Sequence, residues 1–394
     1  MNRFFTDKQG NPLLLTGLQA HNSSTGTDML DKAIHAVKLC GGNVLETPIY
    51  WYAIEPEKDH YDMSLIRETI DRTRKAGLYL ILLWFGTSKN GHPNYVPEYI
   101  KLDPATYRPA INDSGSPLVA LTPHCAATLE RDALAFERVM AFLKEYDGET
   151  GTVIGVQVEN EMGIGYTDRD YSTLANRDYE KPLPEELRDV ELEDCGERDG
   201  SNTWVGQFGR HAHEAFNAWY HALYIGQIAR RGRAQYDFPV LYTNVMIGET
   251  GYEEPGKCYN SGAAVGRVLD IWKKGAPALD LIAPDIYNPE LSVYSRICSR
   301  YARPDNALFI PETSPTGEAF AMDLIRAADY GAIGLCGFGA ESALTNNGEL
   351  SEDAYPVMVS MRTIQNLAPL LIRYRGTGRI HCFLQEEFAI KQYL

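Results

Sequence analysis

The chain has 394 residues, 44% of them hydrophobic, and a formal net charge of −16 at pH 7. This excess of acid argues against nucleic acids and anionic membranes as partners, because both carry negative charge. All apolar runs are shorter than the roughly 20 residues of a membrane span, and the start lacks the apolar core of a signal peptide. The seven cysteines are scattered without a C-x-x-C pair, so we expect a cytoplasmic protein with reduced thiols and without metal or cofactor.

Eight short apolar runs follow along the chain, each ending in polar or aromatic residues. They cover residues 13–20, 43–50, 78–85, 153–158, 239–245, 279–287, 307–312 and 332–338. The clearest amphipathic patterns between them cover residues 28–40, 63–76, 126–146, 206–231 and 317–330. Strands that alternate with helices build parallel sheets, so the pattern predicts an α/β protein with a (β/α)8 TIM barrel. An open doubly wound sheet is the alternative, but the glycine-rich phosphate loop that it favours is missing after the early runs.

Two connections are longer than a plain barrel needs. Residues 86–125 follow the third run and are rich in Pro, Gly and Asn, while residues 165–205 follow the fourth run and are acidic. Long loops on compact domains are often lids or binding loops, whereas a charged stretch is usually a solvated surface segment, and both interpretations stay open. We expect residues 1–370 to form the barrel with these two insertions. Residues 371–394 are expected to form a short appendage, or the stump of a β-domain that the chain lacks.

The fourth run ends abruptly in Glu159, Asn160 and Glu161. Two acids at the end of a core strand need a reason, because buried charge is costly without a partner. In parallel barrels the catalytic side chains stand at such strand ends. The alternative is a charged strand exit that is solvated and has no function. We expect Glu161 and Asn160 to face a pocket. The role of Glu159 stays open, and one option is that it points away toward a basic neighbour.

A second strand-end acid, Glu312, closes the seventh run. The ends of different barrel strands converge, so Glu161 and Glu312 are expected to face each other. Glycosidic bond cleavage uses two facing carboxyls: one protonates the leaving oxygen, and the other attacks the anomeric carbon or activates water. A separation of about 5–5.5 Å gives retention and about 6.5–9.5 Å gives inversion. Spacing in the sequence does not distinguish the two.

Further polar and aromatic residues near the strand ends are candidate sugar ligands. Asn160 suits a hydrogen bond to a sugar hydroxyl, which strengthens in the transition state. Tyr287 would hold Glu312 ionised through its phenol, unless it is an ordinary strand-end tyrosine. Aromatic rings can pack on the apolar face of a pyranose, although each ring alone is more often part of the core. The other candidates are His21, Asn22, Glu46, Trp51, Trp84, Phe85, Asn90, Asn244, Phe338 and Glu341.

Several of these segments resemble the motifs of a known clan. Val158-Glu-Asn-Glu-Met-Gly163 resembles the N-E-x-G acid/base motif of clan A glycoside hydrolases, which are retaining (β/α)8 enzymes. Residues 42–51 are similar to the second-strand signature of the β-galactosidases of glycoside hydrolase families 35 and 42, and residues 83–91 to a bacterial branch of family 35-like proteins. The resemblance implies that Glu161 is the acid/base and that Glu312 is the nucleophile.

We therefore expect a retaining, exo-acting β-glycosidase, most closely a β-galactosidase, with a carbohydrate substrate. The same mechanism on another sugar, as in a β-glucosidase, β-mannosidase or α-arabinosidase, is the enzymatic alternative. A catalytically silent carbohydrate-binding barrel is the alternative from another class, although binding alone needs no matched pair of acids. The oligomeric state stays open, with a homo-oligomer among the options.

Overall fold

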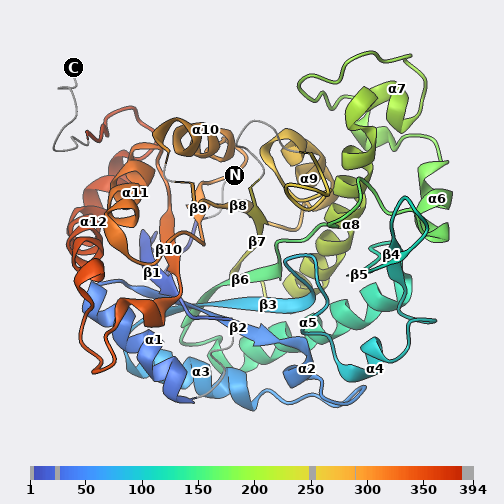
Figure 1. The fold of residues 1–394 in the computed structure, drawn as a ribbon. Coiled ribbons are helices and arrows are strands. Elements are labelled where there is room, and N and C mark those ends of the chain that lie inside the picture. The colour runs from blue at the N-terminus through green and yellow to red at the C-terminus, as the bar shows by residue number, and fades with distance from the viewer. Residues whose placement is uncertain (1–3, 23–26, 248–253, 289, 384–394) are drawn as a thin grey trace.

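The computed structural model describes residues 4–22, 27–247, 254–288 and 290–383. A parallel sheet of eight strands curls into a barrel at its centre, and helices surround it (Figure 1). The barrel strands are β1 (Leu15–Gln19), β2 (Val44–Tyr50), β3 (Tyr79–Lys89), β6 (Val153–Asn160), β7 (Val240–Met246), β8 (Leu281–Asp285), β9 (Phe309–Ile310) and β10 (Gly334–Phe338). Their order is β8-β7-β6-β3-β2-β1-β10-β9. A hydrogen bond of 2.9 Å from Ile286 N to Glu312 O joins the two outer strands, so the predicted barrel is confirmed.

The larger helices cover the outside of the barrel, and the short helices α4 (Glu98–Lys101), α6 (Thr173–Tyr179) and α7 (Trp204–Phe208) lie in the long connections (Figure 1). The other helices are α1 (Thr27–Cys40), α2 (Trp51–Ile54), α3 (Ser64–Lys75), α5 (Ala126–Asp147), α8 (Ala212–Gln235), α9 (Leu269–Gly275), α10 (Leu291–Tyr301), α11 (Gly317–Asp329) and α12 (Tyr355–Tyr374). The prediction of one helix over 206–231 is wrong, because the helix is interrupted between α7 and α8. Gly209 has φ 51°, and a Cβ there would lie 2.1 Å from the carbonyl oxygen of Cys195.

Alternate residues of the strands enter two separate apolar layers. On β3, Ile81 and Leu83 point into the barrel, whereas Leu82 packs in the layer between the barrel and the helices. This two-sided burial explains why the strands read as continuous apolar runs. Phe5 lies inside the barrel with its ring 5.0 Å from that of Phe309, beside the beginnings of the strands. The opposite end, where the strands terminate, is left for polar side chains.

The two long connections differ in where they run. The one after β3 holds α4 and an antiparallel hairpin of β4 (Pro109–Ile111) and β5 (Pro117–Leu121), and it starts after Lys89, because β3 extends beyond the predicted end at residue 85. The one after β6 carries α6 and α7 to the outer side of α8 (Figure 1). Its first residues stay near the barrel end, and Asp170 accepts a hydrogen bond of 3.0 Å from Ile111 N of the hairpin.

The last helix, α12, continues to Tyr374, four residues beyond the end expected for the barrel. Residues 375–383 follow without helix or strand, and residues 384–394 of the expected appendage lie outside the described residues. The division at residue 370 stays a prediction. None of the helices in the described ranges combines the length and apolar character that a membrane crossing needs.

Candidate active site

The end of β6 adopts a backbone that ordinary strands avoid. Glu159 and Glu161 have φ of 62° and 45°, on either side of Asn160. Non-glycine residues in this region are strained and persist only where the surroundings fix them. Glu161 N donates to Asn244 Oδ1 at 3.0 Å, which anchors the turn to β7. As a result Asn160 and Glu161 both reach the same space beyond the strand, instead of pointing to opposite faces.

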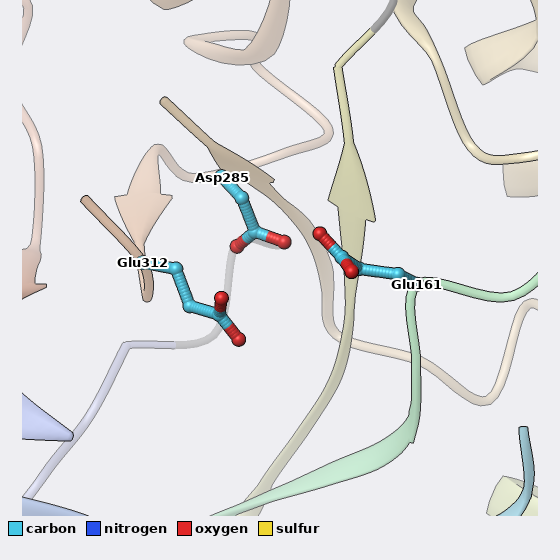
Figure 2. Close-up of side chains that lie close together, drawn as sticks. All are labelled: Glu161, Asp285 and Glu312. Atoms are coloured by element: carbon cyan, nitrogen blue, oxygen red, sulfur yellow. The ribbon is translucent and has the colours of Figure 1, made fainter. Parts of the chain in front are cut away.

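Three buried carboxyl groups converge there from three strand ends. Figure 2 shows Glu161, which follows β6, Asp285, which ends β8, and Glu312, which follows β9. One carboxylate oxygen from each lies within 4.8 Å of those of the other two. Their exposed fractions are only 5%, 3% and 4%. Among the described residues these three are also the one group of acids, histidines and cysteines close enough together to hold a metal ion.

Glu312 is surrounded by hydrogen-bond donors. Its Oε1 accepts from Gln19 Nε2 at 3.1 Å and from the side-chain amides of Asn160 and Asn244 at 3.3 Å each. Its Oε2 accepts from the phenol of Tyr287 at 3.2 Å. Four hydrogen-bond donors from four different residues are therefore directed at this one carboxyl group. The structure thus brings Asn160 and Tyr287 together at Glu312.

Glu161 has a different environment. Burial raises its pKa to about 7, with the negative charge of Glu312 as the second cause, while the Lys89 ammonium and a hydrogen bond with Asp285 act in the lowering direction. A carboxyl with a pKa near neutrality can both donate and accept a proton in the working range. A carboxyl with a raised pKa beside a second carboxyl that accepts several hydrogen bonds is the pattern of an acid and a nucleophile.

Three residues of the cluster were missed by the sequence reasoning: Lys89, Asp285 and Gln19. Lys89 is 7% exposed, and its Nζ donates to Asn160 Oδ1 at 2.8 Å. It was missed because the strand was expected to end at residue 85, whereas β3 continues to Lys89. Asp285 carried the same signal as Glu161, an acid at the end of an apolar run. Gln19 ends β1 and offers only the general signal of a polar residue at a strand end.

The other predicted residues fall into separate groups. His21, Phe338 and Glu341 lie together on the β1–β10 side, with the His21 and Phe338 rings 5.2 Å apart and His21 N donating to Glu341 Oε2 at 3.1 Å. Asn22 accepts a hydrogen bond from Tyr50 through its backbone oxygen. Asn90 lines a neighbouring cavity of about 360 Å³ together with residues of the β4–β5 hairpin and Tyr166.

Glu46 lies fully buried in the barrel, and its pKa is raised well above the usual range, mainly by burial and then by the charge of Glu312. Trp51 and Trp84 are also fully buried, and both pack in the layer between barrel and helices. Their indole N–H groups donate to Glu55 and Asp132 at 2.8 and 2.9 Å. Phe85 points into the barrel with Ile81 and Leu83. The structure therefore places these tryptophans in the core and not in the pocket.

Glu159 faces another acid and not a basic neighbour. Its two oxygens accept hydrogen bonds from Thr87 N at 3.1 Å and Ser88 N at 2.6 Å, and its carboxyl contacts that of Asp132. Burial and the negative charge of Asp132 raise the pKa of Glu159 well above its usual range. The option of a basic partner is thus corrected. The two acids lie against each other as a buried pair, and a hydrogen bond between them requires a proton on one of the two carboxyls.

A cavity of about 200 Å³ opens beside Glu161, Asp285 and Tyr287, and it is otherwise lined by residues such as Met246 and Val293. Met246 also borders the cavity at the hairpin, so the two spaces adjoin. The loop after β3 lines this second cavity through Asn90 and the β4–β5 hairpin. The acidic loop after β6 contributes to that second cavity through Gly165 and Tyr166.

Residues 23–214 match the family model Glyco_hydro_42, described as beta-galactosidase. Among solved structures, a cold-adapted beta-galactosidase from Rahnella sp. R3 aligns with TM-score 0.65 and 15% identity over 94% of this chain and 58% of that one. The beta-galactosidase from Bacillus circulans sp. alkalophilus aligns with TM-score 0.66 and 13% identity over 93% and 58%. The catalytic domain of a beta-amylase from Paenibacillus polymyxa aligns with TM-score 0.63 and 12% identity over 88% and 97%.

At these identities the structural likeness shows the fold. The chain spans somewhat over half the length of the beta-galactosidases that it resembles, 58% in both comparisons. No curated protein matches the sequence. The resemblance to clan A glycoside hydrolases of the β-galactosidase-like families is confirmed, and the matched family model is that of family 42.

Proposed function

From this family 42 glycoside hydrolase barrel and its paired carboxyls, we propose a retaining β-glycosidase that removes a terminal β-linked sugar, most closely a β-galactosidase. Glu161 is the acid/base and Glu312 the nucleophile. The observation that carries the proposal is the facing pair itself: buried oxygens of Glu161 and Glu312 within 4.8 Å of each other, at the ends of two barrel strands. Inverting enzymes keep their carboxyls about 6.5–9.5 Å apart to admit a water molecule, so this pair fits retention.

The reaction then proceeds by double displacement. Glu312 attacks the anomeric carbon while Glu161 protonates the departing glycosidic oxygen, which leaves the sugar bound to Glu312. In the second half, Glu161 takes a proton from water, the water oxygen bonds to the anomeric carbon, and the bond to Glu312 breaks. Asn160, held by Lys89 and Glu312, is placed to bond a hydroxyl beside the reacting carbon. Such a bond strengthens as the transition state forms.

The choice of galactose rests on the family match and not on a contact in the pocket. A panel of nitrophenyl β-D-galactoside, β-D-glucoside, β-D-mannoside and α-L-arabinoside identifies the sugar. NMR of the first-formed anomer identifies the stereochemistry, and a retained anomer is expected. Turnover of none of these compounds would favour the carbohydrate-binding barrel instead.

The roles of the two acids need their own test. Glu161→Gln and Glu312→Gln should each abolish turnover of an alkyl glycoside, and Glu185→Gln, whose side chain is 86% exposed, is the matched control. Azide added to Glu312→Ala should restore activity and give a glycosyl azide of inverted configuration. Full activity of Glu312→Ala without azide would contradict the assignment. A cytoplasmic location and a homo-oligomer remain proposals, to be checked by fractionation and by light scattering.

A further inference from the structure

Asp285 is the member of the carboxyl cluster to which the double displacement gives no task. Its Oδ2 accepts a hydrogen bond of 2.8 Å from Asn244 Nδ2. Its Oδ1 accepts none from the N–H and O–H groups of the described residues. Glu312, by contrast, accepts four. Asp285 is therefore the poorer of the two at holding a negative charge, and one of its oxygens is directed toward Glu161 in Figure 2.

The groups that face Asp285 reinforce this difference. Two are acids, Glu161 and Glu312, and one is a cation, Lys89 on β3; the phenols of Tyr242 on β7 and Tyr287 complete the set. Burial raises the pKa of Asp285 well above the usual range, the charges of Glu312 and Glu161 raise it further, and Lys89 offsets only a part. Three carboxylates this close together cannot all be ionised in a buried site. One proton stays in the cluster when Glu161 gives up its own.

We propose that Asp285 retains this proton and donates it in a hydrogen bond to Glu161, which makes Asp285 the positioning residue that tunes the acid/base. The inference rests on the proposed glycosidase function, in which Glu161 alternates between carboxylic acid and carboxylate. When Glu161 has protonated the departing oxygen, the O–H of Asp285 stabilises the carboxylate that remains. The proton of Asp285 is not transferred, so it is neither consumed nor replaced during turnover.

Two substitutions distinguish this role from its opposite. Asp285→Asn keeps a donor toward Glu161 and an acceptor for Asn244, while Asp285→Ala removes both. If Asp285 is a neutral donor, the pH at which kcat/KM falls on the basic side of its pH profile rises by about one unit in the alanine variant. In the asparagine variant it stays within a few tenths of a unit of the wild type. If Asp285 were ionised, both variants would lose a negative charge beside Glu161. This pH would then move down in both, which would overturn the proposal.

A comparison of substrates with poor and good leaving groups distinguishes an effect on the acid Glu161 from a general loss of structure. Asp285→Ala should lower kcat/KM about tenfold or more on an alkyl glycoside, whose oxygen needs protonation, and much less on a dinitrophenyl glycoside, which departs unaided. Equal losses on the two substrates would count against the proposal.

If the alanine variant does not fold, infrared difference spectra between the wild type and Asp285→Asn at pH 7 decide. They must show the band of a protonated carboxyl in the wild type, and its absence rejects the inference.

Failure of this inference differs from failure of the proposed function. A wild type that turns over none of the glycosides would reject the glycosidase itself, and activity that survives in Glu161→Gln and Glu312→Gln would reject the assigned acid pair. Loss of activity in those two variants, together with an unshifted basic side of the pH profile in Asp285→Ala, would reject only the role of Asp285.

Discussion

The carboxyl of Glu159 meets that of Asp132 inside the protein, directly behind the strand end that presents Glu161. Asp132 on α5 accepts hydrogen bonds from Trp84 Nε1 at 2.9 Å and from the hydroxyl of Thr87 at 2.6 Å. Glu159 accepts from the backbone amides of Thr87 and Ser88. The pair thereby joins α5, β3 and β6 at the level of the active site. It fixes the segment that carries Lys89 as well as the strained turn that carries Asn160 and Glu161.

This pair predicts a pH dependence of stability. Burial raises the pKa of both Glu159 and Asp132. A raised carboxyl pKa means that the folded state holds more protons than the unfolded state above about pH 4.3, so stability falls as pH rises toward the folded value. One proton shared by the pair changes the unfolding free energy with a slope of at most about −1.4 kcal/mol per pH unit.

Urea unfolding between pH 5 and pH 8 measures this slope. Glu159→Gln should make the slope of unfolding free energy against pH shallower by up to the contribution of one proton, about 1.4 kcal/mol per pH unit, because a neutral amide replaces the protonated carboxyl. The exposed Glu185→Gln should leave the slope unchanged. An identical slope in the wild type and Glu159→Gln would show that the pair carries no proton.

The pKa of Glu161 predicts the basic limb of the activity profile. Its carboxyl is raised to about 7, and the acid form is required for protonating the leaving group, so kcat/KM of a nitrophenyl glycoside should fall by half near pH 7 and continue to fall above it. Glu161→Gln should lose this limb with the nitrophenyl glycoside, and it should retain glycosylation with a dinitrophenyl glycoside, which departs unaided. A limb that persists unchanged in Glu161→Gln would assign the titration to another group.

The fold and the proposed reacting pair were predictable from the sequence for a physical reason. Strands buried on both faces require unbroken apolar runs, and a strand that ends in charge has to end at a pocket or in water, so Glu161 and Glu312 stood out. Gly209 shows what the pattern hides. The amphipathic period continues through this residue, whereas the helix is interrupted there, where the Cys195 carbonyl oxygen approaches the backbone closely.

Local sequence also could not separate core rings from pocket rings. Trp84 and Phe85 are neighbours on β3, and which of them faces the barrel depends on the register of the closed sheet. The partner of Glu159 depends on α5, since Asp132 lies in a helix 27 positions earlier in the chain. Lys89 was missed because a strand end is recognised by its apolar run, and β3 continues for four polar or small residues beyond that run.

Lys89 should act on Glu161 through its charge. The ammonium lowers the pKa of Glu161, so Lys89→Met is expected to move the basic limb of kcat/KM upward by several tenths of a pH unit. Loss of its hydrogen bond to Asn160 should also reduce kcat by about tenfold or more, because the sugar hydroxyl ligand is no longer fixed. Lys181→Met, with a side chain 65% exposed, is the control. A downward shift of the limb would contradict the assigned sign.

The tryptophan and phenylalanine candidates should separate cleanly in one experiment. Trp51 is fully buried and donates to Glu55, so Trp51→Phe is expected to cost about 1–3 kcal/mol of unfolding free energy through the lost hydrogen bond and packing, with KM little changed. Phe338 is only partly buried and packs on His21 at the barrel end. Phe338→Ala should therefore raise KM for the sugar by severalfold, since ring contacts with sugars are worth roughly as much as other aromatic pairs, about 0.5–1.5 kcal/mol. Urea unfolding and steady-state kinetics on both variants measure the two effects. A raised KM in Trp51→Phe with unchanged stability would instead make that ring a sugar contact, the less common of the two options that the sequence left open.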